Sequence, residues 1–463
     1  MSRTCIICGL PASSREHLFP AALGGRRTNK GIYCHDHNNA YGPVLEPLVA
    51  QLAFFNAQLN VVGDRANAVR PVPLIEKETG RRVLATGSSL RVEGPALMRA
   101  AEMIDNGPVR RVAAFDQAQA ARAASEAKAG GEPPHRVLRS PQHVGTLHGT
   151  MSFGGPEGLR AIAYVAQTHF AQAFPELVRT DAFSPLKDYT LNGSGPPLAW
   201  WCFAPVEELG ANRFAFGHRI VVGVDASSAV AFAQVSLFSA LHFNVILGSV
   251  REESSRTRVT DIDPLAPYPP HDRVEWNAGA LVDVPRHSPD PVTALRFALE
   301  SGQVAAAIND LMARVQDHNL KMEALQLFND LLTIASVVEN ECVTLIAERL
   351  RRHERRIVFL MEHVVDGLQQ DGADPLMKAM AEILRPLVAR NPYRPSGLAP
   401  EAERMASICT RALATQLDCD LKSGALTLER VVALLGHGIG AAIVSHAMAT
   451  DLFGEGLLAP LVV

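Results

Sequence analysis

The chain has 463 residues, of which 47% are hydrophobic and 20% are charged. This balance is that of an ordinary globular protein, and it excludes an intrinsically disordered chain. The net charge of −4 and the isoelectric point near 6.5 also exclude a protein that coats nucleic acid over its whole surface. A chain of this length is expected to hold two or three domains, each with its own hydrophobic core.

The seven cysteines do not form the dense set that is typical of a disulfide-stabilised secreted domain. Three lie within the first 34 residues, and the others are scattered through apolar or helical sequence. The polar N-terminus predicts no signal peptide, and the longest apolar run, 431–447, is too short to span a membrane. Together these features predict a cytoplasmic protein without a membrane segment.

The first 52 residues hold two pairs of candidate zinc ligands, Cys5-x2-Cys8 and Cys34-x2-His37. Two such pairs can close a tetrahedral zinc site, although His35 competes with His37 for the fourth position. We expect zinc to stabilise a segment that is too small to fold alone. The alternative is a zinc ribbon that serves only for binding.

Residues that a purely structural zinc site does not need lie between and just after these pairs. We expect a strand carrying Glu16 and His17, a loop, a second strand near 31–33 and a helix starting near Asn38, which together make a ββα unit. Glu16 and Asn38 would then converge on one hard divalent cation. His17, on the other side of the strand, would take a proton from water, and Asn29 would hydrogen-bond backbone near His17.

Basic residues outnumber acidic ones in the first 42 residues, on a chain that is acidic as a whole. Three of them lie in the loop between the two expected strands, where they are candidate contacts for phosphate groups: Arg26, Arg27 and Lys30. The alternative is a solvated loop without a partner.

This segment resembles the HNH (ββα-metal) endonucleases, in the variety that carries a zinc knuckle. The resemblance rests on the paired cysteines, Glu16-His17-Leu18-Phe19-Pro20, Gly24-Gly25, Asn29 and Cys34-x2-His37-Asn38. It implies DNA hydrolysis with His17 as base, Asn29 as its positioning residue, and Glu16 and Asn38 as ligands of the catalytic cation. Two departures are His37 in place of cysteine and Asn38 in place of histidine, and the second favours Mg²⁺ or Mn²⁺.

Residues 55–255 predict a single α+β domain. In chain order we expect a hairpin over 72–75 and 82–85, an exposed helix over 113–129, an amphipathic helix over 159–174, and strands over 219–224 and 230–238. The segment 263–291 is rich in proline and predicts a linker.

Residues 293–463 predict an all-helical domain, with apolar residues three and four apart over 304–315, 322–350 and 357–368. The run 348–356 carries five arginines, which would either grip phosphates or form a solvated, salt-bridged helix face. This domain is the expected site of a protein partner or of self-association.

The sequence therefore predicts an α+β protein with a zinc-stabilised ββα-metal module at 1–52, an α+β middle domain and an all-α C-terminal domain. The predicted function is that of a metal-dependent HNH endonuclease with structural Zn²⁺, catalytic Mg²⁺ or Mn²⁺ and DNA as substrate; the resemblance suggests restriction-like or phage-defence enzymes. The alternative is a non-catalytic, zinc-dependent module that binds nucleic acid or protein, with a helical domain that recruits a partner.

Overall fold

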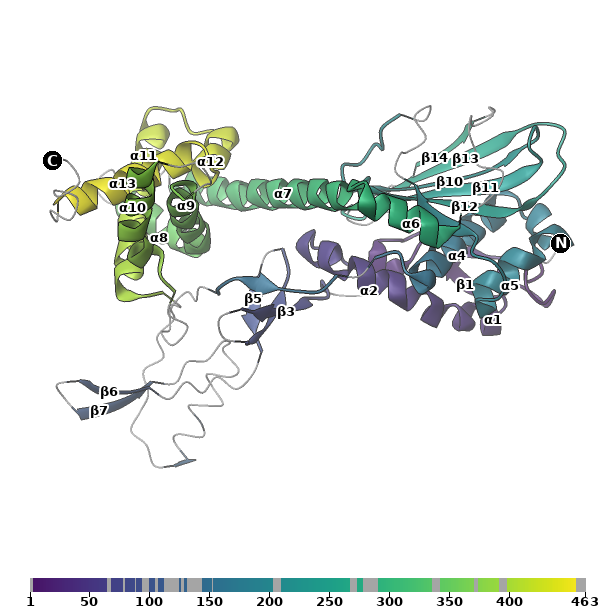
Figure 1. Cartoon of the computed structure of the whole chain (residues 1–463), viewed down its shortest axis with the longest axis horizontal. Helices are drawn as coiled ribbons and strands as arrows, with labels where there is room; N and C mark the ends of the chain where they lie inside the picture. Colours follow the sequence, from purple (N-terminus) through teal and green to yellow (C-terminus); the bar gives the residue numbers. More distant parts are fainter. Residues whose placement is uncertain are drawn as a thin grey trace. The chain divides into compact units, whose positions relative to one another are not determined.

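The computed structural model gives the chain an α+β fold with sheets in its first two thirds and a helical C-terminal part, as the sequence predicts (Figure 1). The structure describes residues 3–64, 68–77, 80–87, 89–93, 100–104, 107–111, 125, 129–130, 144–151, 153–202, 210–266, 273–277, 290–334, 342–369, 374–390 and 398–454. The helix predicted over 113–129 lies outside the described residues, apart from 125 and 129.

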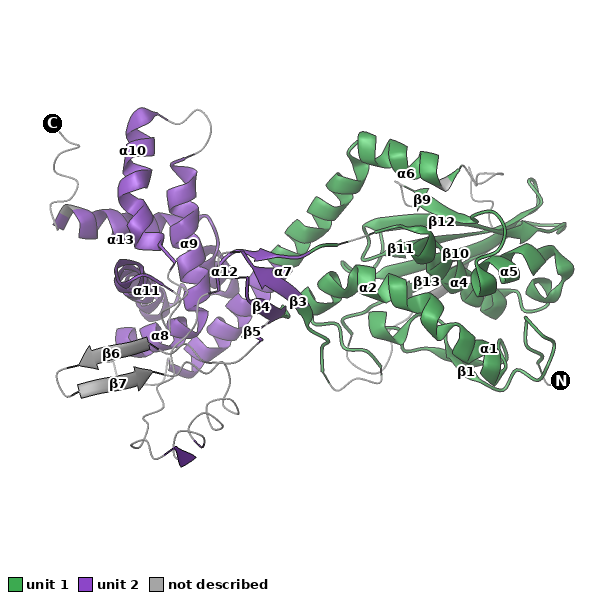
Figure 2. Ribbon diagram, turned by 60° about the horizontal axis from the view of Figure 1, so that its bottom comes forward, with its two compact units in different colours: residues 1–72, 85–89, 150–316 green, residues 73–84, 90–149, 317–463 purple. Residues whose placement is uncertain are grey.

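The chain divides into two compact units (Figure 2). Unit 1 comprises residues 1–72, 85–89 and 150–316, and unit 2 comprises 73–84, 90–149 and 317–463. The last boundary between them along the chain lies inside one long helix, α7 (Gln303–Ile334). The predicted domains 1–52, 55–255 and 293–463 divide the chain differently and stay a prediction.

Unit 1 begins with a ββα arrangement. Strands β1 (Arg15–His17) and β2 (Thr28–Lys30) pair antiparallel, and helices α1 (His35–Ala40) and α2 (Gly42–Gln58) follow. The strand expected near 31–33 is wrong, because β2 ends at Lys30 and Gly31 takes a φ of 122°, which ends the extended backbone. The buried side chains of Ile32 and Tyr33 then lead into α1, which starts three residues earlier than expected.

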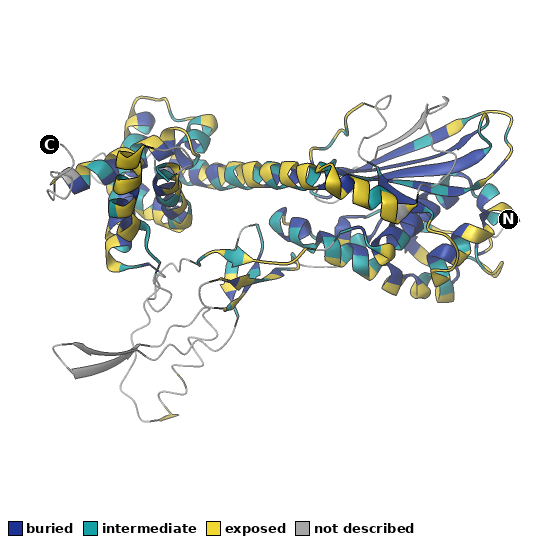
Figure 3. Cartoon of the chain, in the orientation of Figure 1, coloured by how far each residue is buried: buried dark blue, intermediate teal, exposed yellow. Residues whose placement is uncertain are grey.

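The centre of unit 1 is a six-stranded antiparallel sheet with the strand order β14-β13-β10-β11-β12-β9. Its strands are β9 (Ala199–Cys202), β10 (His218–Asp225), β11 (Val230–Leu237), β12 (Leu241–Ser249), β13 (Arg256–Ile262) and β14 (Arg273–Asn277). The two predicted strands are confirmed as β10 and β11, in which every residue is buried (Figure 3). The prediction of a linker was wrong for 273–277, since these residues pair with β13 as part of the sheet.

Helix α4 (Pro156–Ala173) confirms the amphipathic helix predicted at this position, and α5 (Ser184–Asn192) follows it. Helix α4 contacts strands β9 to β12 on one side and α2 on another, so most of its residues are buried. Unit 1 continues through α6 (Pro291–Glu300) into the first part of α7.

The first residues of unit 1 share one hydrophobic core with the sheet. The ring of Phe19 stacks on that of His218 in β10 with 4.6 Å between centroids, and Phe55 in α2 lies 6.0 Å from Phe238. The His218 Nε2 atom also lies 3.1 Å from the carbonyl oxygen of Leu23. The ββα arrangement is therefore supported by the sheet and does not stand alone.

Unit 2 contains a small sheet with the order β5-β4-β3-β8 and a separate hairpin, β6-β7. The hairpin predicted over 72–85 is confirmed as β3 and β4. The strands are β3 (Val72–Glu76), β4 (Arg82–Ala85), β5 (Leu90–Val92), β6 (Ala100–Ile104), β7 (Gly107–Arg111) and β8 (Leu147–His148).

The helices of unit 2 after α7 surround a second hydrophobic core. They are α8 (Cys342–Leu350), α9 (Glu354–Gly367), α10 (Pro375–Leu384), α11 (Pro400–Lys422), α12 (Leu428–Leu435) and α13 (Ile439–Gly454). Among the described residues no single helix is long and apolar enough to cross a membrane, and α12 with α13, bent by 49°, meets that test only as a pair.

The arginine-rich run 348–356 forms a salt-bridged face, one of the two alternatives considered for it. Arg355 and Arg356 lie 3.4 and 3.2 Å from the carboxylate of Glu323 in α7. Arg352 pairs with Asp330 of the same helix at 3.2 Å. These pairs join α7 to α9 and to the short segment before it within unit 2.

Candidate metal centre and neighbouring histidine

Four ligand atoms from the first 37 residues converge on one point. The thiol sulfurs of Cys5, Cys8 and Cys34 and a ring nitrogen of His37 all lie within 4.8 Å of one another. His37, and not His35, completes this group, which settles the choice that the sequence left open. The cluster can hold a metal ion.

The distances suit a tetrahedral zinc ion. Zn–S bonds of about 2.3 Å and Zn–N bonds of about 2.0 Å place two sulfurs about 3.8 Å apart and a sulfur and a nitrogen about 3.5 Å apart. The Sγ atoms of Cys8 and Cys34 are 3.8 Å apart. The Nδ1 atom of His37 lies 3.8 Å from the sulfur of Cys5 and 3.1 Å from that of Cys34. Three sulfurs and one imidazole are also a common donor set of structural zinc.

Local structure brings each pair of ligands together. Cys5 begins a tight turn in which its carbonyl oxygen accepts a hydrogen bond from the amide of Gly9, whose φ is 73°. Cys34 is the N-cap of α1 and His37 lies in its first turn, so their side chains share one face. The amide of Ile6 donates to the carbonyl of Ile32, which joins the two ligand loops.

A residue from outside the first 52 residues also holds the two ligand loops together. The guanidinium of Arg179, which follows α4, donates to the carbonyl oxygens of Thr4 at 2.7 Å and of Gly31 at 3.0 Å. The metal cluster is therefore attached to the body of unit 1.

Glu16 and His17 point to opposite sides of β1, as the alternation of a strand predicts. Glu16 is 8% exposed and accepts a hydrogen bond at 2.9 Å from the hydroxyl of Tyr164 in α4. Beyond it lies a buried polar network in which Gln167 donates to the hydroxyls of Tyr33 and Tyr41. Burial raises the pKa of Tyr33 and of Tyr164 well above the ordinary value, and the charge of Glu16 adds to this effect.

His17 faces a carboxylate that sequence reasoning missed. Its Nε2 atom lies 3.0 Å from Oδ2 of Asp64, in the loop after α2. Asp64 is 47 positions further along the chain and belongs to no motif, so no local signal pointed to it. The other carboxylate oxygen, Oδ1, lies 3.6 Å from Nη1 of Arg26.

The two asparagines lie in different settings. Asn29 pairs with Glu16 in the β1–β2 register, but its side-chain amide donates to Gln172 of α4. Asn38 donates from Nδ2 to the hydroxyl of Ser14 at 2.8 Å. Its Oδ1 atom is buried and has no hydrogen-bond partner among the described residues. An amide oxygen without such a bond can act as a ligand for a hard cation.

The three basic residues proposed for nucleic-acid contact are not equally accessible. Lys30 is exposed, and Arg27 is partly buried. Arg26 is turned inward, since its side chain is 13% exposed and also donates to the carbonyl of Val62 at 3.2 Å. Lys30 is the one most available to a phosphate.

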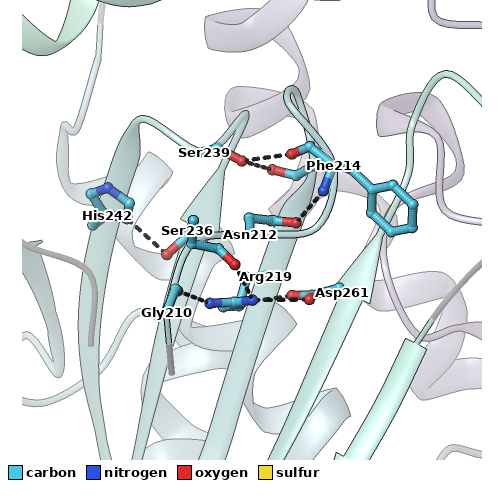
Figure 4. Close-up of polar contacts among 10 residues, drawn as sticks. Gly210, Asn212, Phe214, Arg219, Ser236, Ser239, His242 and Asp261 are labelled. Atoms are coloured by element: carbon cyan, nitrogen blue, oxygen red, sulfur yellow. Dashed lines mark hydrogen bonds and ion pairs between the residues drawn. The ribbon is translucent and has the colours of Figure 1, made fainter. Parts of the chain in front are cut away.

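A second polar cluster lies on the sheet (Figure 4). The guanidinium of Arg219 makes two bonds, of 2.6 and 3.0 Å, to the carboxylate of Asp261, and donates to the carbonyl of Gly210. Beside it, Nδ1 of His242 lies 2.8 Å from the hydroxyl of Ser236, its cross-strand neighbour. Ser236 is only 3% exposed, so this pair is better explained as part of the sheet than as a nucleophile with its base.

Comparisons of the chain with protein-family models, with curated proteins and with solved structures found no match in any of the three.

Proposed function

We propose that the protein is a metal-dependent endonuclease of the HNH type that hydrolyses phosphodiester bonds of DNA, and that the Cys5, Cys8, Cys34 and His37 cluster holds a structural zinc ion. The observation that carries the proposal is the buried Oδ1 of Asn38, which has no hydrogen-bond partner among the described residues and lies one residue after a zinc ligand. This is the position at which the family pattern places a ligand of the catalytic cation.

Glu16 and Asn38 would hold that cation. A carboxylate and an amide oxygen are hard donors, which suits Mg²⁺ or Mn²⁺. When bound, the cation would stabilise negative charge on the phosphate and on the leaving 3′ oxygen.

His17 would act as the general base. The imidazole accepts a proton from a water molecule, whose oxygen attacks the phosphorus as the bond to the 3′ oxygen breaks. Histidine suits this role because its neutral form is abundant near pH 7. Lys30, exposed at the end of β2, would contact a backbone phosphate and orient the strand.

The test is plasmid cleavage by the purified protein with Mg²⁺, Mn²⁺ or EDTA, alongside His17→Ala. We expect the substitution to lower the cleavage rate about 10²- to 10⁴-fold, the usual contribution of a general base. His35→Ala is a matched control, because His35 is an exposed histidine of the same segment, outside the metal cluster. Equal zinc content in all three proteins would rule out loss of folding, and unchanged cleavage by His17→Ala would refute the assignment.

One observation favours the alternative of a binding protein without hydrolysis. Glu16 is 8% exposed and already accepts a hydrogen bond from Tyr164, so its carboxylate is less available to a solvated cation than that of a surface residue. A protein that binds DNA but cleaves it with neither Mg²⁺ nor Mn²⁺ would support this alternative.

A further inference from the structure

The carboxylate of Asp64 is held in one orientation by two partners, one on each oxygen. Oδ2 lies 3.0 Å from Nε2 of His17, and Oδ1 lies 3.6 Å from the guanidinium of Arg26. Both members of the first pair are shielded from solvent, with side-chain exposures of 12% for His17 and 23% for Asp64.

The surrounding backbone keeps this carboxylate in place. The amide of Asp64 donates to the carbonyl of Ala21 at 3.4 Å, and Arg26 donates to the carbonyl of Val62 in the same loop. The loop after α2 is thus tied to the segment between β1 and β2, on the side of β1 that carries His17.

We propose that Asp64 is the positioning residue of His17: it keeps the proton of the neutral imidazole on Nε2 and leaves Nδ1 as the atom that accepts a proton. An ionised carboxylate only accepts hydrogen bonds, so the hydrogen shared between Asp64 and His17 belongs to Nε2. A neutral imidazole has one N–H, so Nδ1 then carries the lone pair. This role rests on the proposed function, in which His17 is the base, and replaces the positioning role predicted for Asn29.

The variant Asp64→Asn tests the tautomer directly. Arg26 can only donate, so the new amide keeps its oxygen toward Arg26 and turns its NH₂ group toward Nε2 of His17. Nε2 must then accept, and the proton moves to Nδ1, the wrong tautomer for a base acting through that atom. Asp64→Ala imposes neither tautomer. We therefore expect Asp64→Asn to lose about 10²- to 10⁴-fold in cleavage rate, and more than Asp64→Ala.

The decisive measurement is a ¹H–¹⁵N correlation spectrum of the histidine side chains in protein labelled at histidine, with the His17 signals identified by their loss in His17→Ala. We expect the Nε2–H tautomer in the native protein and the Nδ1–H tautomer in Asp64→Asn. Asp188→Asn is the matched control, because Asp188 is an exposed acid of the same unit, and it should leave both tautomer and cleavage unchanged.

The outcomes separate the two proposals. An Nε2–H tautomer that persists in Asp64→Asn, or native cleavage by that variant, would overturn the role of Asp64. If the His17 tautomer changes in Asp64→Asn but the native protein cleaves no DNA, the orienting role of Asp64 would be upheld and the proposed nuclease activity would be refuted. Zinc content and tryptophan fluorescence equal to those of the native protein would establish that each variant is folded.

Discussion

The hydroxyl of Tyr164 in α4 donates a hydrogen bond to Glu16, and Tyr164→Phe removes that bond without disturbing the ring. The ring of Tyr164 stacks on Tyr41 with 4.1 Å between centroids, and phenylalanine keeps that contact. What is lost is the hydrogen bond of 2.9 Å from the hydroxyl to the Glu16 carboxylate. The substitution thus tests the contribution of this buried hydroxyl.

The size of the effect follows from burial. Tyr164 is 2% exposed and Glu16 is 8% exposed, so water does not readily replace the lost donor. A hydrogen bond to a charged group contributes about 1.5–3 kcal/mol to stability. We expect Tyr164→Phe to lower the free energy of unfolding of unit 1 by that amount. Tyr189→Phe is the control, since Tyr189 is 6% exposed and no hydrogen bond joins its hydroxyl to a described residue. Its effect should stay within about 0.5 kcal/mol.

Urea unfolding followed by tryptophan fluorescence is the suitable assay. The three tryptophans, Trp200, Trp201 and Trp276, all belong to unit 1, so their emission reports on this unit. If Tyr164→Phe destabilises unit 1 no more than Tyr189→Phe does, the carboxylate of Glu16 does not depend on this donor and the reasoning is refuted.

Three further predictions concern the metal, pH and a buried ion pair. Cys34→Ser should lose its zinc to a chelator while Cys419→Ser, altered at an exposed thiol outside the cluster, keeps it; equal zinc content would contradict the metal site. Burial lowers the pKa of three histidines of unit 1 from 6.5, to about 4 for His169 and His242 and to about 3 for His218. As the pH falls, the unfolded chain therefore takes up their protons first, and the stability of unit 1 should fall by up to about 4 kcal/mol per pH unit between pH 6 and 4.5, measured by urea unfolding; a flat profile would argue against neutral buried rings. Asp261→Ala should cost about 3–5 kcal/mol because it leaves Arg219 buried without its partner, whereas Glu252→Ala, in an exposed pair with Arg256, should cost less than about 1 kcal/mol; similar losses in the two variants would be inconsistent with this difference.

The elements that the sequence predicted are those whose pattern is local. Helix α4 follows from apolar residues three and four apart, and β10 and β11 follow from runs of β-branched and apolar residues. The two ligand pairs were likewise visible, because a spacing of two residues places both side chains of each pair on one side of a turn or of a helix start. Patterns of this kind can be recognised without knowing which distant residues lie nearby in space.

The structure differs from the sequence prediction in the second strand of the first module and in part of the predicted linker. The second strand was expected near 31–33 and lies at 28–30, since the positive φ of Gly31 breaks the strand. Part of the predicted linker pairs with β13 as β14, although its proline-rich surroundings gave no such indication. The conformation of one glycine decided the first case and a pairing strand decided the second, and residue composition predicted neither.

Only the tertiary structure decided which side chains surround the candidate site. Asp64 reaches His17 from 47 positions away, and Tyr164 reaches Glu16 from 148 positions away. Neither contact leaves a trace in local spacing, because it arises where α4 and the loop after α2 pack against β1. The sequence by itself determined which residues carry side chains suited to metal binding or to proton transfer. The packing of distant segments determined which of them are buried, which are oriented and by what partner, since burial and hydrogen bonding depend on neighbours in space rather than along the chain.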